Sequence, residues 1–171
     1  AMADAFDITI RREPVDVAAL VKEVAEANQP LAVNKQQAIN VTAPPNIVTM
    51  CDTDRIREAI DNLISNAIKY SPTGGKVTFD VRLEAGCYVL SVSDQGIGIP
   101  PDELPHLFSS FHRASNVGDI KGTGLGLAIV KHALSHHDSR LEIDSAPGKG
   151  ARFSFVLPER LLVSRKTTTP A

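Results

Sequence analysis

One stretch of the chain, RIREAIDNLISNAIKYSP at residues 55–72, predicts a helix with two very different faces. Apolar residues recur in it at the spacing of a single helical face, which predicts packing against a core: Ile56, Ala59, Ile60, Leu63, Ile64, Ala67 and Ile68. Polar residues line up along another face: Arg55, Glu58, Asn62, Asn66 and Lys69. Asparagine inside a helix costs roughly half a kcal/mol relative to alanine, so two asparagines on one face indicate a use for their amide oxygens.

These amide oxygens fit a particular kind of ligand. An uncharged oxygen is a hard ligand suited to Mg²⁺, and Lys69 follows Asn66 closely enough to meet the phosphates that such an ion accompanies. We interpret this polar face as the floor of a magnesium-nucleotide site. Taken by itself, such a stripe is more often a solvated helix surface, so the rest of the chain must decide.

Composition narrows the function classes. A length of 171 residues, with 43% hydrophobic and 22% charged residues, predicts one soluble globular domain. The net charge of -2 lacks the basic excess of a nucleic-acid-binding protein, and no apolar run has the length of a membrane span. Cys51 and Cys87 fall in predicted apolar segments, which indicates buried thiols in a reducing cytosol. We expect residues 1–7 to be a tag or linker remnant and residues 159–171 to be a disordered tail.

Apolar periodicity outlines the other elements. It predicts strands at 8–11, 38–42, 47–51, 76–84, 87–94, 140–144 and 151–157. A helix is expected from 17 to about 36, with a kink or a break at Pro30. Asp52 or Asp54 would cap the helix at 55–72, and a further helix follows the glycine-rich run that ends near residue 127.

Asp94 ends a predicted apolar strand and is followed by two closely spaced glycines, Gly96 and Gly98. Glycines at that spacing let a ligand approach the backbone, and the carboxylate can accept a hydrogen bond from an exocyclic amine such as that of adenine. An Asx turn leaving the strand explains an Asp-x-Gly sequence as well. The second glycine, with Ile99 and Pro100 after it, favours a binding site.

Residues 101–121 lack strong periodicity, which inside a compact domain indicates a functional lid. The lid leads to Gly122, Gly124 and Gly126 just before a helix, whose free N–H groups and dipole favour phosphate. The run matches neither the dinucleotide fingerprint nor the Walker loop. A hinge for the lid is a second explanation, and both can hold at once.

Two cations and two histidines complete the candidates. Arg113 and Lys121 stand where a cation could reach terminal phosphates, although exposed cations are usually only solvated. His132 and His136 lie four residues apart on a predicted helix, but no third ligand accompanies them, so we expect no zinc site.

Five segments occur in one fixed order: Asn62 to Pro72, Asp94 to Pro100, Phe108 to Arg113, Gly122 to Leu127 and Gly148 to Phe153. Together they resemble the ATP-binding catalytic domain of sensor histidine kinases, in the wider superfamily of DNA gyrase, the ninety-kilodalton heat-shock chaperones and MutL. The resemblance covers residues 8–158. It implies a two-layer α/β sandwich, in which a mixed, mostly antiparallel sheet is covered on one face by about three helices. ATP would lie between the central helix and the lid.

The resemblance also implies roles for individual residues. Asn66 looks like the Mg²⁺ ligand with Asn62 beside it, Lys69 would meet the phosphates, Tyr70 would pack on adenine, and Asp94 would accept its amino group. The remaining nucleotide contacts implied by the family are Gly96, Gly98, Ile99, Arg113, Lys121, Gly122, Thr123, Gly124, Leu125, Gly126 and Leu127. The catalytic residues would be Asn62, Asn66, Lys69 and Arg113.

Two positions differ from the residues that are frequent in this family, and a third differs between branches of the superfamily. Ala151 stands where a hydroxyl residue is frequent, and His112 where tyrosine is common. At Asn62 the gyrase-like branch carries a glutamate that can activate water, and an amide cannot serve as that general base. Asn62 therefore favours phosphoryl transfer over hydrolysis.

The implied function is the catalytic domain of a bacterial two-component histidine kinase that uses ATP and Mg²⁺. It would pass the γ-phosphoryl group to a histidine on a separate dimerisation and phosphoacceptor domain of the same full-length chain, through which the protein would form a homodimer. A cognate response regulator would follow. We expect the isolated domain to be monomeric and cytoplasmic, without nucleic-acid or membrane contact, although the full-length protein could carry a membrane anchor. A nucleotide-sensing module and an anti-sigma-factor-type serine kinase are the alternatives.

Overall fold

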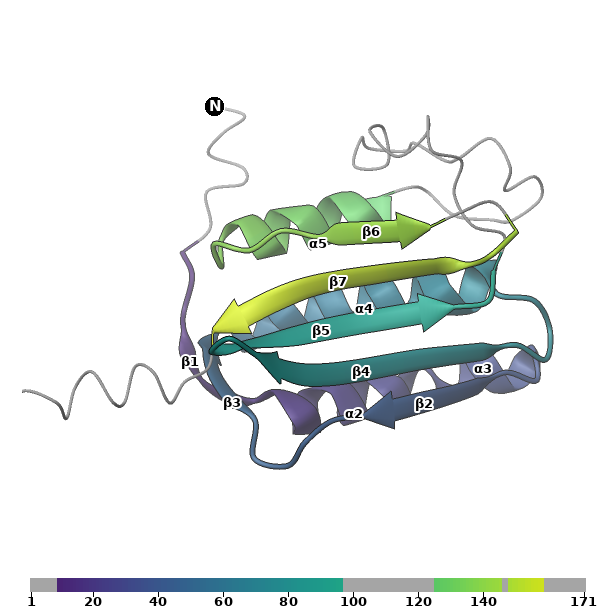
Figure 1. Cartoon of the computed structure of the whole chain (residues 1–171), viewed down its shortest axis with the longest axis horizontal. Coiled ribbons are helices and arrows are strands. Elements are labelled where there is room, and N and C mark those ends of the chain that lie inside the picture. The colour runs from purple at the N-terminus through teal and green to yellow at the C-terminus, as the bar shows by residue number, and fades with distance from the viewer. Residues whose placement is uncertain (1–8, 97–124, 146–147, 159–171) are drawn as a thin grey trace, which may run out of the picture.

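In the computed structural model, which describes residues 9–96, 125–145 and 148–158, helices cover one face of a five-stranded sheet (Figure 1). The described elements, in chain order, are β1 (Glu13–Asp16), α2 (Val17–Ala27), α3 (Gln29–Asn34), β2 (Ala38–Thr42), β3 (Val48–Cys51), α4 (Thr53–Tyr70), β4 (Lys76–Glu84), β5 (Cys87–Asp94), α5 (Leu125–Ser135), β6 (Glu142–Ser145) and β7 (Ala151–Pro158).

The sheet is mixed and mostly antiparallel, as the sequence predicts. Its strand order is β2, β4, β5, β7, β6, and among these strands β2 and β4 form the parallel pair while the other neighbours are antiparallel. β1 and β3 form a separate antiparallel pair. The expected two-layer α/β sandwich is therefore confirmed.

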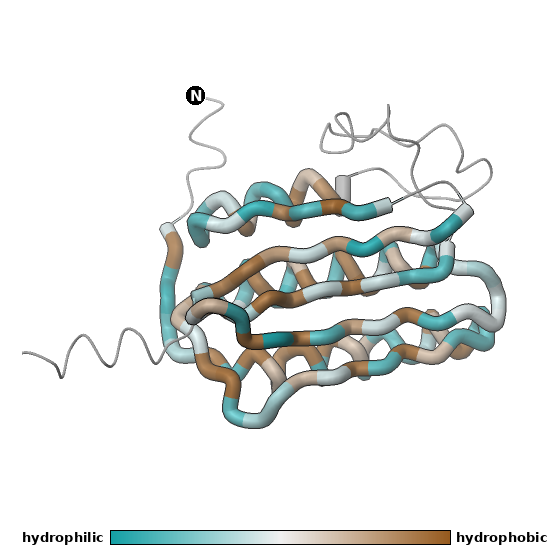
Figure 2. Tube along the Cα trace, viewed as in Figure 1, coloured by the Kyte–Doolittle hydropathy of each residue, from teal (hydrophilic) through white to brown (hydrophobic). Residues whose placement is uncertain are grey.

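Strand alternation decides which face of the sheet the helices cover. Val77, Phe79 and Val81 of β4 are buried, while the residues between them are less buried and belong to the uncovered face. Figure 2 shows the corresponding alternation of hydrophobic and hydrophilic residues along this strand. Full burial of such a side chain contributes about 1.5–3 kcal/mol to stability. The buried face of the strand therefore faces the helices, and the core lies between the sheet and the helices.

α4 is the central helix of this layer, and its apolar face is buried as predicted. Every residue of the predicted apolar stripe is buried: Ile56, Ala59, Ile60, Leu63, Ile64, Ala67 and Ile68. The structure also settles which aspartate caps the helix. Asp52 Oδ1 accepts hydrogen bonds from the N–H groups of Asp54 and Arg55 at 3.1 and 3.3 Å, and Oδ2 accepts from Arg11 N at 3.0 Å.

The N-terminal part contradicts one sequence prediction and bears out another. The strand expected at 8–11 is wrong, because the first strand begins at Glu13 and is defined by long-range pairing with β3. The helix expected from 17 to about 36, with a kink or a break at Pro30, is indeed broken into two helices at Asn28, and Pro30 stands in the first turn of α3, where its missing N–H costs nothing. Residues 1–7 and 159–171 lie outside the described residues.

The two cysteines differ in burial, and neither forms a disulfide. Cys51 is buried and Cys87 half-buried, and both are free thiols.

His137 is buried between α4 and the end of α5: its Nε2 lies 2.9 Å from the backbone N of Asp52, and its Nδ1 lies 2.8 Å from Ala133 O. Because a backbone N–H can only donate, Nε2 accepts and the proton resides on Nδ1. The ring is therefore held neutral.

This arrangement predicts a pH dependence of stability. Burial lowers the pKa of His137 from its ordinary value of 6.5, so the unfolded chain binds a proton at mildly acidic pH that the folded chain excludes. The stability from this residue is complete above pH 6.5 and declines as the pH falls below it towards the folded-state pKa. We expect His137→Gln to flatten the pH dependence of the unfolding free energy between about pH 6.5 and pH 5, measured by urea denaturation.

A matched variant separates this effect from a general loss of histidine. His132→Gln alters a half-buried histidine of α5, the helix that precedes His137, and is expected to leave the slope in place. An unchanged slope in His137→Gln would show that other groups set the acid sensitivity.

Candidate functional site

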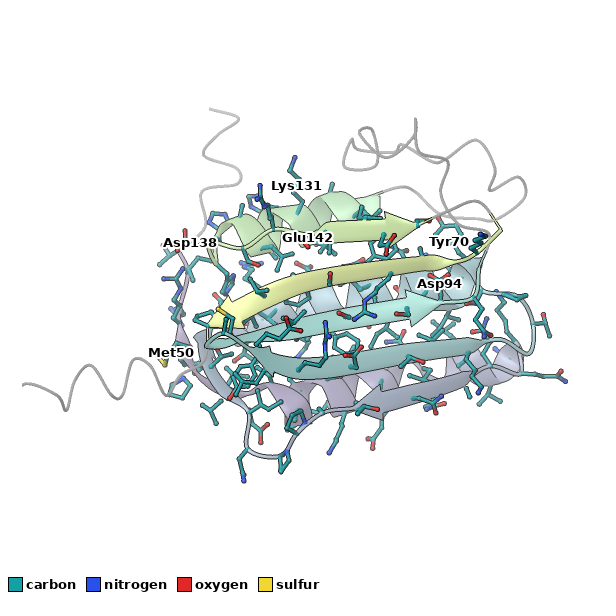
Figure 3. The ribbon with its side chains drawn as sticks, viewed as in Figure 1. Met50, Tyr70, Asp94, Lys131, Asp138 and Glu142 are labelled. Atoms are coloured by element: carbon teal, nitrogen blue, oxygen red, sulfur yellow. The ribbon has the colours of Figure 1, made fainter. Side chains whose placement is uncertain are left out.

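The end of α4 and the end of β5 meet at one end of the molecule, where Figure 3 shows Tyr70 and Asp94 near each other. Gly96 marks the point of contact. A Cβ atom placed on this residue would lie 2.2 Å from Tyr70 O and 2.8 Å from Asp94 Oδ1, so the backbone of Gly96 packs directly on the last residue of the helix. Any other residue there would force the two elements apart.

Asp94 has the character of a partly desolvated hydrogen-bond acceptor. Burial raises the pKa of its carboxyl group, and hydrogen bonds from the backbone N–H groups of Gly96 and Ala151 act in the opposite direction. The bond from Gly96 N to Oδ1 is 2.8 Å long and forms an Asx turn. The turn does not exclude a ligand, because a carboxylate offers about four lone-pair sites. Asp94 can therefore accept a hydrogen bond from an amine while its backbone contacts hold it in place.

The turn before β7 supports Asp94 from another side. Gly150 has φ +79°, and a Cβ atom on it would lie 2.2 Å from Asp94 O. Ala151 follows, with a buried side chain and a backbone N–H that reaches the Asp94 carboxyl group. Although Ala151 lacks a hydroxyl group, its main chain still contacts the acidic residue.

Along α4, Asn62 and Asn66 are half-buried and Lys69 is exposed. Asn62 Nδ2 donates to Glu58 O at 2.8 Å. The nitrogen of the side-chain amide is therefore used within the helix, and its oxygen is the atom that a ligand can reach. The side-chain amide of Asn66 forms no hydrogen bond to another residue in the part of the chain that the structure describes. The helix therefore carries two amide oxygens that suit a hard cation, followed by an ammonium group.

Several predicted site residues lie outside the described ranges. These are Gly98, Ile99, Arg113, Lys121, Gly122, Thr123 and Gly124, together with the lid expected at 101–121 and His112. Leu125 and Gly126 begin α5, which packs against α4, and the half-buried Leu127 packs on the core. The side of the site that these residues would form thus remains a prediction.

The sequence did not single out two residues that join the two halves of the site. Gln95 N donates to Ser71 Oγ at 3.2 Å, and Gln95 Oε1 accepts from Lys76 N at 3.0 Å. Ser71 is buried directly after α4. A serine between a helix end and a proline is a weak local signal, and no periodicity marks Gln95.

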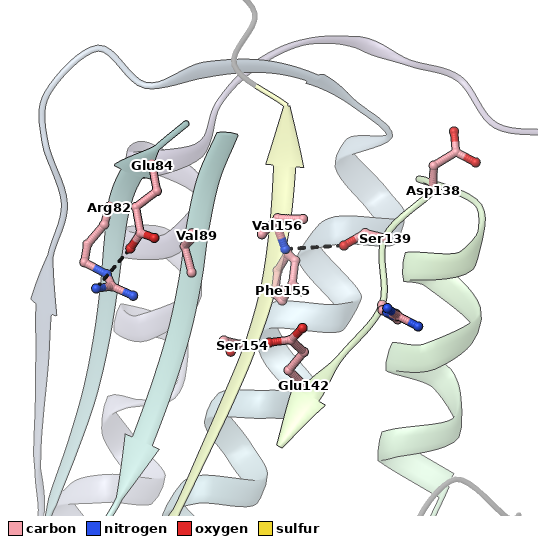
Figure 4. A pocket seen from close by; sticks show the side chains of 10 residues that line it. Arg82, Glu84, Val89, Asp138, Ser139, Glu142, Ser154, Phe155 and Val156 are labelled. Atoms are coloured by element: carbon pink, nitrogen blue, oxygen red, sulfur yellow. Dashed lines mark hydrogen bonds and ion pairs between the residues drawn. The ribbon is translucent and has the colours of Figure 1, made fainter. Parts of the chain in front are cut away.

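Other features of the described residues lie away from this site. A cavity of about 520 Å³ opens on the uncovered face of the sheet, lined by residues that include Val89, Val156 and the ion-paired Arg82 and Glu84 (Figure 4). It lies over the half of β5 opposite to Asp94. His132 and His136 have Nε2 atoms 3.3 Å apart, and within the described ranges no group of three or more His, Cys, Asp or Glu side chains could hold a metal.

None of the described helices is both long enough and apolar enough to cross a membrane.

The sequence matches a known family model. Residues 51–161 fit the model described as "Histidine kinase-, DNA gyrase B-, and HSP90-like ATPase". The chain is 40% identical over 156 residues to the phosphate regulon sensor protein PhoR of Pseudomonas aeruginosa, which covers 90% of this chain and 35% of that protein. It is 38% identical over 149 residues to the sensor-like histidine kinase SenX3 of Mycolicibacterium smegmatis, covering 86% of this chain and 39% of that protein. The chain spans well under half the length of both relatives.

Solved structures give the same fold. The mycobacterial sensor histidine kinase MprB superposes with a TM-score of 0.76 at 32% identity, over 87% of this chain and 98% of that one. Full-length ShkA in complex with AMPPNP superposes with a TM-score of 0.77 at 29% identity, over 89% of this chain and 32% of that one.

The turn before β7 offers a test of the packing around Asp94. Gly148 and Gly150 have φ values of +77° and +79°, but a Cβ atom on Gly148 would meet nothing within 4 Å. Both alanine variants carry the left-handed backbone cost of roughly 1–2 kcal/mol, and only Gly150→Ala adds the collision with Asp94 O. We expect Gly150→Ala to lower the unfolding free energy by at least about 2 kcal/mol more than Gly148→Ala, measured by urea denaturation. Equal losses in the two variants would contradict the described contact.

Proposed function

The chain belongs to the family of histidine kinase-, DNA gyrase B- and HSP90-like ATPases, and we propose that it is the ATP-binding catalytic domain of a two-component sensor histidine kinase. In this role it delivers the γ-phosphoryl group of ATP to a histidine on a separate dimerisation and phosphoacceptor domain. One named relative is a phosphate regulon sensor protein and the other a sensor-like histidine kinase, which favours this branch of the family.

The observation that carries the proposal is the contact of Gly96, whose N–H binds Asp94 Oδ1, with the end of α4. It joins an acceptor for the adenine amino group to a helix that carries amide and ammonium groups along the neighbouring turns. Asn62 and Tyr70 are eight residues apart, so these groups extend over about 12 Å of helix. One helix can thus contact both the base and the phosphates of a single nucleotide.

Mg²⁺ fits the donor set of α4. Asn66 would bind it through the amide oxygen with Asn62 beside it, because Mg²⁺ prefers oxygen ligands and takes few of them from the protein. The ion, when bound, neutralises negative charge on the phosphates. Lys69 places a further positive charge near them, and Tyr70 packs on adenine.

The residues outside the described ranges would close the site. Arg113 and Lys121 would approach the terminal phosphates from the lid. The glycine-rich run at residues 122–126 would surround the phosphates with backbone N–H groups at the start of α5, where the helix dipole favours negative charge. Gly98 and Ile99 would complete the base pocket.

Asn62 favours transfer to a protein over hydrolysis. An amide has no basic lone pair with which to remove a proton from water, so the residue cannot act as a general base. The domain therefore accelerates transfer by orienting ATP and stabilising charge. Its partners would be the phosphoacceptor domain of the same full-length chain, which also forms the homodimer, and a cognate response regulator. The isolated domain would be a cytoplasmic monomer.

A variant of the magnesium ligand tests this function. We expect Asn66→Ala to weaken Mg-ATP binding by at least about tenfold, because it removes an oxygen ligand from the metal. Binding is measured by isothermal titration calorimetry, and a thermal melt checks the fold. Asn40→Ala, on an exposed position of β2, is the matched control. Unchanged affinity in Asn66→Ala would refute the magnesium assignment.

The same proteins then decide the reaction. With γ-labelled ATP and an added phosphoacceptor domain, the wild type and Asn40→Ala are expected to label a histidine of the acceptor, and Asn66→Ala is not. Label on serine would support the serine-kinase alternative, and ATP binding without any transfer would support a nucleotide-sensing module.

A further inference from the structure

The C-terminal end of α4 is held by side chains from the segment between α3 and β2. Lys35 Nζ donates hydrogen bonds to three carbonyl oxygens: Ile68 O at 2.8 Å, Lys69 O at 3.0 Å and Ser71 O at 2.7 Å. An ammonium group has three donors, so each is used. The last carbonyls of a helix lack intrahelical partners and carry its negative dipole end, which makes a cation favourable here.

Gln37 adds a second set of bonds to the same backbone. Its Nε2 lies 3.1 Å from Ile68 O, 3.0 Å from Ser71 O and 3.2 Å from Pro72 O, and the side chain is buried. The main chains are joined as well, because Gly74 N donates to Lys35 O at 2.9 Å. We call Lys35 and Gln37 together the carbonyl clamp.

The clamp replaces the usual way in which a helix ends. Many helices end with a glycine in the left-handed conformation, whereas Ser71 follows α4 in an extended conformation with φ -82° and ψ 147°. Burial lowers the pKa of Lys35, so desolvation of the ammonium group offsets part of the stabilisation that the helix end gives it, a cost that a glycine cap would avoid. A cap that carries this desolvation cost indicates that the position of this helix end is important.

The backbone held by the clamp also forms the candidate site. Within residues 68–72 the clamp binds the carbonyls of Ile68, Lys69, Ser71 and Pro72, whereas that of Tyr70 packs on Gly96. The side chains of Lys69 and Tyr70 leave from this same turn.

We propose that Lys35, assisted by Gln37, is a positioning residue for the nucleotide site, which holds the last turn of α4 so that Lys69 and Tyr70 stand opposite Asp94 and Gly96. The inference rests on the proposed function, since it concerns the same site. It predicts that loss of the clamp weakens nucleotide binding through local loosening of the helix end.

The experiment compares Lys35→Met with Lys22→Met, which removes an exposed lysine of α2. Calorimetry is expected to show Mg-ATP affinity about tenfold lower in Lys35→Met and unchanged in Lys22→Met. Lys35→Arg, which keeps the charge and the donors, is expected to restore most of the affinity. Gln37→Met keeps the ammonium group and is expected to show the same defect to a smaller degree, which serves if Lys35→Met does not fold.

Hydrogen exchange in the nucleotide-free protein separates positioning from general stability. In Lys35→Met the amide of Ser71, which bonds to Ala67 O, is expected to lose more protection than the mid-helix amide of Ile60. Equal losses at both amides, or affinity in Lys35→Met within twofold of the Lys22→Met control, would overturn the proposal. If the wild type itself fails to bind Mg-ATP, the proposed function fails, while the exchange comparison still tests the clamp.

Discussion

The contact between Tyr70 O and Gly96 is the constraint on which the site depends. It brings the end of a helix and the end of a strand from opposite layers of the sandwich to backbone contact, which only glycine allows. Several neighbours hold this contact from different directions. The carbonyl clamp fixes the helix end, the Ser71–Gln95 hydrogen bond links it to the strand end, and Gly150 packs under Asp94.

This geometry gives Asp94 its chemical character. Burial raises the pKa of the carboxyl group, and two backbone N–H groups oppose that rise by stabilising the charged form. A partly desolvated acceptor held in one orientation discriminates strongly between ligands that donate a hydrogen bond and ligands that do not. The polar face of α4 supplies groups for phosphate binding. Its amide oxygens suit the metal ion that accompanies the phosphates, and its ammonium group suits the phosphates themselves. In the proposed function, base recognition and phosphate binding would therefore be joined through a single helix.

Local patterns in the sequence predicted most of this architecture. The apolar stripe of α4 and the alternation in β4 and β5 each report one buried face, and both were confirmed. The predictions failed where distant pairing decides, as in β1, which forms by pairing with β3. The carbonyl clamp was missed for the same reason, since its partners lie 31 to 36 residues away and its residues follow no period. Asn62, Asn66 and Asp94 could be predicted as site residues from the sequence, because asparagine in a helix and aspartate before paired glycines are locally unusual.

The central claim is that adenine nucleotide binds between the polar face of α4 and the end of β5. Backbone chemical shifts of the ¹⁵N-labelled protein, followed by NMR during titration with Mg-ATP, test it most directly. The account predicts the largest changes at Asn66, Tyr70 and Gly96, with Val89 and Val156 of the open-face cavity unchanged. Changes confined to Val89 and Val156, with none at Gly96, would contradict it.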